Sequence, residues 1–220
     1  MRAALLDALG TIVELERPWP HLVAELRARG VVVSEDDARR AMLAEMAYYR
    51  DNHDDASDYA GLKDLRRRCA AIVQAELGVA LPIDEVQDAM LAAIRFRPYP
   101  EVPAVLAALR ERGAAIVVVS NWDVSLHDVL ERTRLRPLVD GVVTSAEFGA
   151  AKPDPAIFAR ALELAGGVAP ADAVHAGDSV EADVAGAKAA GIPAVLVARD
   201  GEPAPEGVRA IRTLEGLISG

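Results

Sequence analysis

The sequence predicts an α/β protein in which a doubly wound, Rossmann-like parallel sheet forms the core and a four-helix cap domain is inserted into it. Short apolar runs alternate with helical segments through the second half of the chain, a pattern typical of βαβ units. One further run lies near the start, and after it the pattern is helical for about 80 residues. We therefore predict a core domain of residues 1–16 and 98–220 and a cap domain of residues 17–97.

The strands of the core are expected to be buried and parallel. Their sequences are rich in Val and Ala, as in strands that helices cover on both faces. Five apolar runs predict strands, at residues 3–6, 115–119, 142–144, 173–175 and 194–197. The segments that alternate with them predict helices, near residues 102–112, 124–132, 155–165 and 181–190.

The inserted segment is expected to be a small bundle of helices joined by short loops. The second helix should begin at Ser34, whose hydroxyl can cap it ahead of three acidic residues. Residues 51–58 are acidic and irregular and predict a loop, while proline clusters at 17–20 and 97–100 predict stiff, extended connectors. The four predicted helices cover residues 21–29, 34–46, 59–77 and 84–94.

Composition and charge exclude several classes of function. The net charge of −10 disfavours binding to a nucleic-acid backbone, which requires a basic surface. No apolar run approaches 18 residues and the first residues do not resemble a signal peptide, so we expect no membrane association. The single cysteine, Cys69, excludes an internal disulfide and fits a reducing compartment. The sequence therefore predicts a cytoplasmic protein.

Acidic residues follow the first and the fourth predicted strand. Asp7 ends the first apolar run, and Asp178 ends the fourth, with Asp183 five positions later. Ligands of open α/β sheets bind at the carboxyl ends of the strands, so these three carboxylates should lie close together. Clustered carboxylates repel one another unless a cation joins them. We therefore predict a hard-metal site with one aspartate placed for chemistry.

Two further polar segments are expected at the same edge. Ser120-Asn121 closes the second core strand, and Lys152 directly precedes Pro153-Asp154-Pro155, which opens a helix. Together these segments provide a carboxylate nucleophile, a hydroxyl beside backbone amides, a lysine and two acids for a metal. Phosphoryl transfer through an aspartyl-phosphate needs these groups.

These segments, in this order, resemble the four motifs of the haloacid dehalogenase superfamily of hydrolases, in its phosphatase-type branch with a helical cap after the first strand. The motifs are Asp7-Ala8-Leu9-Gly10-Thr11, Ser120-Asn121, Lys152-Pro153-Asp154-Pro155 and Gly177-Asp178-Ser179-Val180-Glu181-Ala182-Asp183. The resemblance covers the whole chain and implies Mg²⁺-dependent hydrolysis of a small phosphorylated metabolite through an aspartyl intermediate. We expect the protein to act as a monomer or homodimer.

The resemblance also implies roles for individual residues. Asp7 would be the nucleophile, Ser120 would hydrogen-bond the transferring group, and Lys152 would offset negative charge. The residues implied to contact the substrate are Gly10, Thr11 and Asn121. The residues implied to form the Mg²⁺ site are Asp7, Leu9 (through its carbonyl), Asp178 and Asp183. Of these, Asp183 is expected to orient Lys152 or the waters of the metal from outside.

One position departs from the phosphatase pattern. Phosphatases of this family place a second aspartate two residues after the nucleophile, where it protonates the leaving oxygen and later activates water; this chain has Leu9. Such an acid–base contributes about 10²–10⁴-fold in rate. Its replacement should slow the hydrolysis of alkyl phosphates and matter less for acyl phosphates or aryl esters, whose leaving groups need no proton.

Three alternative functions follow from this departure. The 2-haloacid dehalogenases also lack the second acid and share Ser120-Asn121, but they use no metal and have serine where this chain has Asp178. Phosphonoacetaldehyde hydrolase lacks the acid as well and uses a cap lysine, whereas the only lysine of this insert, Lys63, is expected on a solvated helix face. The third alternative, supported by Leu9 alone, is a catalytically impaired phosphate-binding protein.

Overall fold

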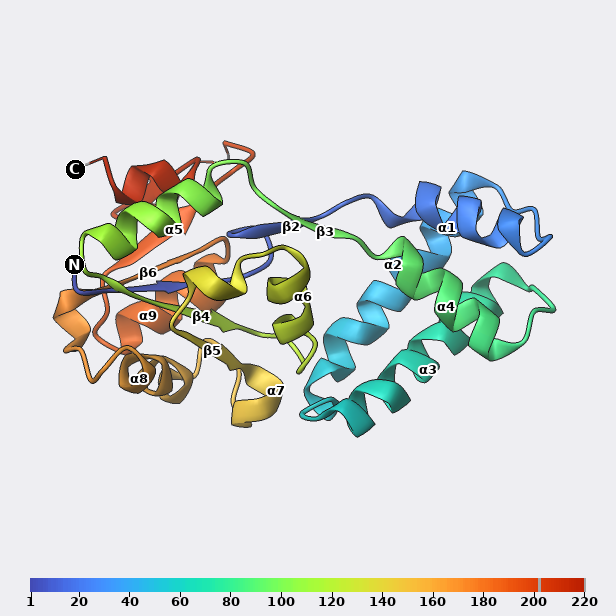
Figure 1. Cartoon of the computed structure of the whole chain (residues 1–220), viewed down its shortest axis with the longest axis horizontal. Coiled ribbons are helices and arrows are strands. Elements are labelled where there is room, and N and C mark those ends of the chain that lie inside the picture. The colour runs from blue at the N-terminus through green and yellow to red at the C-terminus, as the bar shows by residue number, and fades with distance from the viewer. Residues whose placement is uncertain (202, 220) are drawn as a thin grey trace. The chain divides into compact units, whose positions relative to one another are not determined.

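The chain folds into two compact units in a computed structural model that describes residues 1–201 and 203–219 (Figure 1). The α/β unit consists of Met1–Glu14 and Arg97–Gly220, and the helical unit consists of Leu15–Phe96. The chain leaves the α/β unit through β2 (Val13–Leu15) and returns through β3 (Phe96–Pro98), and these two short strands pair with each other.

The elements of the α/β unit alternate between strand and helix. Its strands are β1 (Ala3–Leu6), β4 (Ala115–Ser120), β5 (Gly141–Thr144), β6 (Ala173–Gly177), β7 (Ala194–Val197) and β8 (Arg209–Ile211). Its α-helices are α5 (Val102–Glu111), α6 (Leu126–Arg132), α7 (Ser145–Phe148), α8 (Pro155–Leu164) and α9 (Gly186–Ala189). Shorter or irregular helical segments are η2 (Arg136–Leu138), η3 (Pro170–Asp172), η4 (Val180–Ala185) and η5 (Leu214–Leu217).

The described strands of the α/β unit form one parallel sheet in the order β5–β4–β1–β6–β7–β8, which confirms the predicted fold class. The central strand is β1, and its Leu6 lies in register with Val118 of β4 and Ala176 of β6. The edge strand β8 was not expected from the sequence, because residues 209–211 are largely exposed and lack an apolar run.

Helices cover both faces of the sheet, as Figure 1 shows for α5 and α8. Side chains alternate between the two faces of a strand, so Leu5, Val117 and Val119 point to one face. There they form a buried cluster with Phe158 of α8. On α5, Leu109 and its neighbours are buried where the helix contacts β4. The run of apolar residues in each strand is therefore explained by burial on both sides.

The helical unit contains α1 (Pro18–Ala28), α2 (Glu35–Asn52), η1 (His53–Asp55), α3 (Tyr59–Leu77) and α4 (Ile83–Ala93). Ser34 caps α2 as expected, because its hydroxyl oxygen accepts the Asp37 amide at 3.0 Å. Asp58 caps α3 in the same way, and α3 ends at Gly78, which takes the left-handed conformation that glycine tolerates best.

Some boundaries differ from those predicted. The first proline cluster is not an extended connector, because α1 begins at Pro18; a proline in the first helical turn has no N–H that the helix would need. Residues 51–55 are helical rather than irregular. The helix expected over residues 181–190 begins as the wider π-helical segment η4 and continues as α9.

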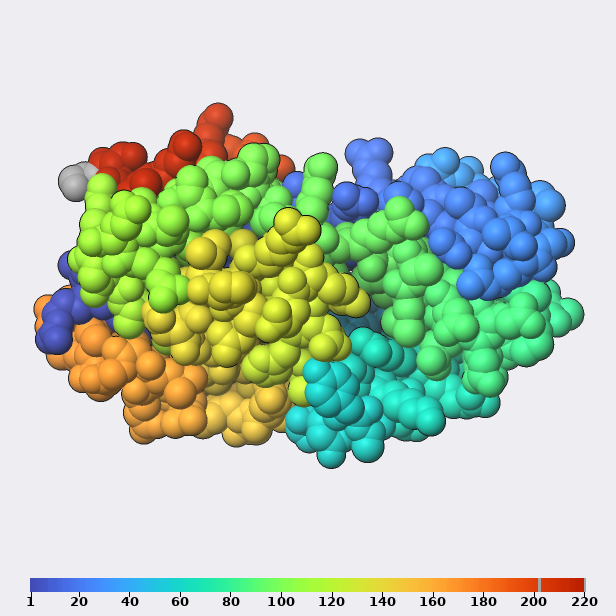
Figure 2. Space-filling view, viewed as in Figure 1, coloured from blue at the N-terminus to red at the C-terminus, as the bar shows by residue number. Residues whose placement is uncertain are grey.

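The C-terminal segment packs on the surface of α5, as Figure 2 shows for the red and green segments of the α/β unit. Arg112, at the end of α5, donates to the Ile218 carbonyl at 2.8 Å. None of the helices in the described part of the chain combines the length and apolar character needed to cross a membrane.

Candidate active site

The predicted site residues meet at the carboxyl edge of β1. Asp7 directly follows β1, and the register of β1 with its two neighbours brings the ends of β4 and β6 to either side of it. Ser120 is the last residue of β4, and Asp178 follows β6 directly. Because parallel strands end at the same edge of a sheet, residues far apart in the sequence become neighbours here.

Asp7 is buried and receives two hydrogen bonds on the same oxygen. The Ser120 hydroxyl donates to Asp7 Oδ1 at 3.0 Å, and Lys152 Nζ donates to that atom at 2.6 Å. The side chains of Lys152 and Asp7 are only 2% and 9% exposed, so their charges interact with little screening by water. Three of the residues predicted from separate motifs are therefore in direct contact.

Asp183 holds Lys152 from the other side. Its Oδ1 accepts Lys152 Nζ at 2.5 Å and His175 Nε2 at 2.9 Å, and its Oδ2 accepts the Ser179 amide at 2.9 Å. A side chain at Gly177 would overlap the Asp183 carboxyl group, so a glycine is required there. Both oxygens of Asp183 thus have protein donors, and Lys152 is one of them.

Asp178 lies against the turn that follows Asp7. A Cβ atom at Gly10 would overlap Asp178 Oδ2, and Gly10 has a φ of +76°, which favours glycine. One carboxylate oxygen from each of Asp7, Asp178 and Asp183 lies within 4.8 Å of the others. Carboxylate oxygens are the ligands that Mg²⁺ prefers, so the donor set of this acidic cluster fits a hard divalent cation.

The ionisation of the cluster reflects an excess of negative charge. Burial and then the Asp7 and Asp183 charges raise the pKa of Asp178 to about 6. Burial is also the main cause that raises the pKa of Asp7, although the Lys152 charge opposes it. Burial acts to lower the pKa of Lys152, but the two carboxylates outweigh it and raise that pKa. For Asp183, the Lys152 charge and the His175 hydrogen bond overcome burial and lower the pKa. One lysine therefore balances three clustered acids only in part.

Backbone hydrogen bonds hold the turn after Asp7. The amides of residues 11–13 all donate to the Ala8 carbonyl, at 3.3, 2.9 and 3.0 Å, and the Gly10 amide donates to the Val13 carbonyl at 2.9 Å. Leu9 lies in this turn with its side chain exposed. The turn thus presents Leu9 and Gly10 in a fixed backbone conformation.

Asn121 and Thr11, both expected to contact substrate, have other surroundings. Asn121 Nδ2 donates to the Lys152 carbonyl at 2.9 Å, and its Oδ1 accepts the Lys152 amide at 2.7 Å. The Asn121 side chain therefore anchors the loop of Lys152, which leaves its backbone for the expected substrate contact. The Thr11 side chain is fully buried; among the described residues, its Oγ1 and His175 Nδ1 are the buried side-chain polar atoms without a hydrogen-bond partner.

Two residues at the site were not recognised from the sequence. His175 ends the strand predicted over residues 173–175; it packs edge-on against Phe158, with ring centroids 5.0 Å apart, and it also donates to Asp183. The alternation of side chains along β6 could have indicated this, because it places His175 on the same face of the strand as Gly177, next to the acidic residues. Arg199, which lies outside the predicted strands and helices, contacts the turn after Asp7. In the helical unit, Lys63 is exposed on α3, as expected for a solvated helix face.

Known proteins resemble this chain in both sequence and structure. Residues 1–191 match the family described as haloacid dehalogenase-like hydrolase. A mouse protein named haloacid dehalogenase-like hydrolase domain-containing protein 3 is 32% identical over 222 residues, covering 95% of this chain and 86% of that protein. Glyceraldehyde 3-phosphate phosphatase from Methanopyrus kandleri is 33% identical over 205 residues, covering 90% and 84%.

A similar solved structure extends over the full length of the chain. It is the crystal structure of a HAD phosphatase from Thermococcus onnurineus, which superimposes with a TM-score of 0.67 at 28% identity. The match covers 99% of this chain and 96% of the other.

Proposed function

Because the chain belongs to the haloacid dehalogenase-like hydrolases, we propose that it is a Mg²⁺-dependent phosphatase that hydrolyses a small phosphorylated metabolite through an aspartyl-phosphate at Asp7. The observation that carries the proposal is the environment of Asp7 Oδ1, which receives both the Ser120 hydroxyl and the Lys152 ammonium group. The name of the Methanopyrus kandleri relative, a phosphatase of a small phosphorylated sugar, supports this class of substrate. Residues 17–97 are proposed as the cap domain that selects the substrate.

The acidic cluster is the proposed Mg²⁺ site. Asp7 and Asp178 would bind the ion with the Leu9 carbonyl, while Asp183, whose oxygens already accept three protein donors, would hold Lys152 from outside. When bound, Mg²⁺ would neutralise negative charge on the carboxylates and on the phosphoryl oxygens.

Each protein group around Asp7 has its own proposed role in phosphoryl transfer. Asp7 Oδ1 would attack phosphorus, forming the new oxygen–phosphorus bond as the bond to the leaving oxygen breaks. Lys152 would balance the charge of the transferring group, and Ser120 would orient it by hydrogen bonding. Asp183 would keep the lysine in place. Water would then hydrolyse the aspartyl-phosphate, releasing phosphate and restoring Asp7.

Leu9 determines which leaving groups the site can handle. A leucine side chain cannot donate a proton, and it occupies the position from which the family's phosphatases protonate the leaving oxygen. We therefore propose that the site favours leaving groups of low basicity, such as acyl or aryl oxygens, over alkoxides. An alkoxide leaving group would depart more slowly by about 10²–10⁴-fold.

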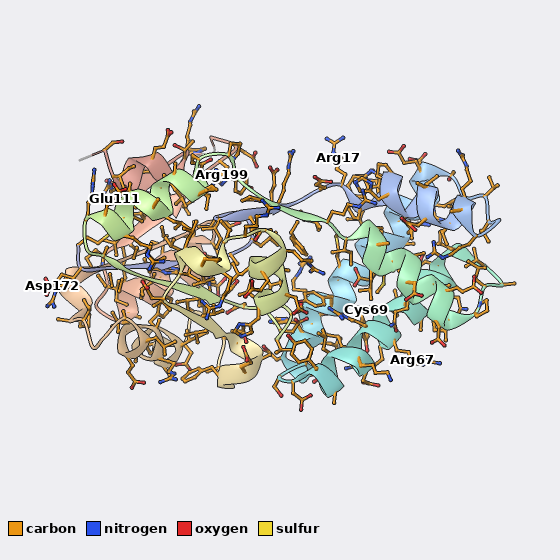
Figure 3. All side chains as sticks on the ribbon, in the orientation of Figure 1. Arg17, Arg67, Cys69, Glu111, Asp172 and Arg199 are labelled. Carbon is orange, nitrogen blue, oxygen red and sulfur yellow. The ribbon has the colours of Figure 1, made fainter. Side chains whose placement is uncertain are left out.

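A parallel activity screen tests this proposal. The purified protein is given alkyl and aryl phosphates, acyl phosphates, phosphonoacetaldehyde and 2-chloropropionate, each with Mg²⁺ and with a chelator. We expect phosphate release that requires Mg²⁺, is fastest for acyl and aryl phosphates, and is abolished in Asp7→Asn. Asp172→Asn is the matched control. Asp172, labelled in Figure 3, is exposed in η3 and lies away from the carboxyl edge of β1.

Other outcomes of the screen point to other functions. Chloride release that is insensitive to the chelator would contradict the phosphatase and support a dehalogenase, which Ser120-Asn121 resembles. Cleavage of phosphonoacetaldehyde that is lost in Lys63→Arg would support a phosphonatase. Silence towards every compound, with Mg²⁺ binding retained, would support a phosphate-binding protein.

A further inference from the structure

Arg199 binds the backbone of the turn that follows Asp7. It lies two residues after β7, near the start of α5 in Figure 3. Its Nε donates to the Gly10 carbonyl at 3.0 Å, and its Nη2 donates to the Thr11 carbonyl. One guanidinium group therefore holds two consecutive carbonyls of this turn. All three residues belong to the α/β unit.

The same guanidinium group is fixed by two other contacts. Its Nη1 donates to Glu101 Oε1 at 2.9 Å, and its central carbon lies 3.3 Å from the centre of the Tyr99 ring. The side chains of Arg199 and Glu101 are 14% and 12% exposed, so this ion pair is mostly shielded from water. Although burial acts in the other direction, hydrogen bonds from a backbone amide and from Arg199 lower the pKa of Glu101. The Arg199 guanidinium group is thus paired with a shielded carboxylate and stacked on an aromatic ring.

The contacts of Arg199 complete the hydrogen bonding of consecutive peptide groups. In a trans peptide, the C=O and N–H point in opposite directions. The amides of Thr11 and Ile12 donate inward to the Ala8 carbonyl, while the carbonyls of the same two peptide groups accept from Arg199. Each of these peptide groups is therefore held on both of its sides, which leaves it little freedom to rotate.

This turn contains two backbone groups that matter for the proposed Mg²⁺ site, the Leu9 carbonyl and Gly10. The Gly10 amide donates to Val13, so the Leu9 carbonyl of the same peptide group points the opposite way. Gly10 also packs so closely against Asp178 that it leaves no space for a Cβ atom. A rotation of the next peptide group, which Arg199 holds by its carbonyl, would disturb both features.

We propose that Arg199 is a positioning residue for the active site, which fixes the Leu9–Gly10 backbone and thereby the place of Asp178. The proposal rests on the phosphatase function proposed above, since it assigns that backbone to the Mg²⁺ site. Arg199 acts through the turn and needs no contact with substrate. Its partner Glu101 and the Tyr99 ring keep the guanidinium group in position.

The test compares Arg199→Gln with a matched arginine. Arg110 also donates to a backbone carbonyl, that of Pro137 at 2.6 Å, and also has a carboxylate partner, Asp140, but it lies on α5. Arg110→Gln therefore controls for the loss of an arginine–carbonyl bond in the same unit. Arg199→Lys keeps the charge but cannot reproduce the planar fork of donors.

Three measurements on the full-length protein separate a positioning role from a stabilising one. Amide hydrogen exchange of residues 10–13 in metal-free protein should become about tenfold faster in Arg199→Gln. Mg²⁺ affinity, measured by calorimetry with the ion alone, should fall about tenfold. With p-nitrophenyl phosphate, kcat should fall by a similar factor of about ten while KM changes little. Arg199→Lys should recover part of each effect, and Arg110→Gln should match wild type.

The outcomes decide between the two roles. If Arg199→Gln matches Arg110→Gln in exchange, Mg²⁺ affinity and kcat, the proposal is overturned. If wild type itself releases no phosphate, the phosphatase proposal fails, while exchange and Mg²⁺ binding still decide the role of Arg199. If Arg199→Gln does not fold, Glu101→Gln replaces it, because loss of the Nη1 anchor should give smaller changes in the same direction. Wild-type behaviour in Glu101→Gln and Arg199→Lys would then overturn the proposal.

Discussion

At the scale of single residues, Lys152 is the cation of a buried cluster of charges. Its ammonium group lies between Asp7 and Asp183, and all three side chains are buried. Removing charges from water costs several kcal/mol per ion, and a buried pair recovers this only with good geometry. The third acid, Asp178, adds further negative charge to the cluster. Such a cluster contributes little to stability and therefore favours a role in binding and catalysis.

Replacing Gly10 should separate backbone strain from disruption of the site. Gly10→Ala and Gly113→Ala both place alanine at a left-handed position, with φ of +76° and +79°. Each should lower the free energy of unfolding by about 1–2 kcal/mol. A Cβ atom at Gly113 meets nothing within 4 Å, whereas one at Gly10 overlaps Asp178. Calorimetry should therefore show Mg²⁺ binding lost in Gly10→Ala alone; equal affinities in the two variants would contradict this assignment.

An acid at position 9 should change the substrate range. In Leu9→Asp, the new carboxyl group can protonate the leaving oxygen, so kcat/KM for an alkyl phosphate should rise by about 10²-fold. The rate with p-nitrophenyl phosphate should change little, because its leaving group needs no proton. Leu9→Asn is the control, since it has nearly the same shape and cannot donate a carboxyl proton. A comparable increase in Leu9→Asn would argue against acid catalysis.

At the scale of elements, the packing of α2 on α3 includes a buried acid. Glu45 is 4% exposed and lies on the same face of α2 as Ala38, Ala41 and Met42. Burial raises the pKa of Glu45 to about 7, while a hydrogen bond from Cys69 of α3 acts in the opposite direction. The helical unit therefore contains a group that is protonated in slightly acidic solution.

The stability of the helical unit should fall as the pH rises. The pKa of Glu45 is about 7 when folded and 4.5 as the ordinary value, so the folded state binds more protons between these limits. Its contribution is full below pH 4.5 and is lost as the pH passes 7. The loss amounts to about 3 kcal/mol. As the pH rises from 5 to 8, urea unfolding should show the free energy of unfolding of wild type falling by about 3 kcal/mol relative to that of Glu45→Gln. Glu76 is exposed on α3, so Glu76→Gln should keep the pH dependence of wild type.

At the scale of the whole molecule, the proposed site belongs to one unit. Asp7, Ser120, Lys152, Asp178 and Asp183 all lie in the α/β unit, although that unit is made from two separate stretches of chain. Its first stretch supplies the nucleophile and its second supplies the other residues. Cation binding therefore requires the two stretches to be assembled in one sheet.

Mg²⁺ should stabilise the α/β unit. An ion that binds only the folded state adds about 2.7 kcal/mol to the free energy of unfolding at 100 times its Kd. Hydrogen exchange with and without Mg²⁺ should show increased protection in peptides from 1–14 and 97–220, with peptides from 15–96 as the internal reference. Asp178→Asn should abolish the increase. Equal protection by Mg²⁺ in wild type and Asp178→Asn would contradict the proposed ligand set.

The sequence alone determined the fold class and the order of the main elements, because local signals are strong in this chain. Apolar runs such as 115–119 mark buried strands, and Gly78 marks the end of α3. Short or exposed elements were missed, since β8 has no apolar run and the two prolines of α1 fit a helical first turn. The periodicity of apolar residues does not indicate elements that are this short or this exposed.

The four motifs identified the residues that gather around Asp7, since parallel strands must end at a common edge. Only the tertiary structure decided what each side chain contacts there. It places Asn121 on the backbone of Lys152, His175 on Asp183, and Arg199 on the turn after the nucleophile. These contacts join residues remote in sequence, and their geometry depends on packing, which no local pattern in the chain encodes.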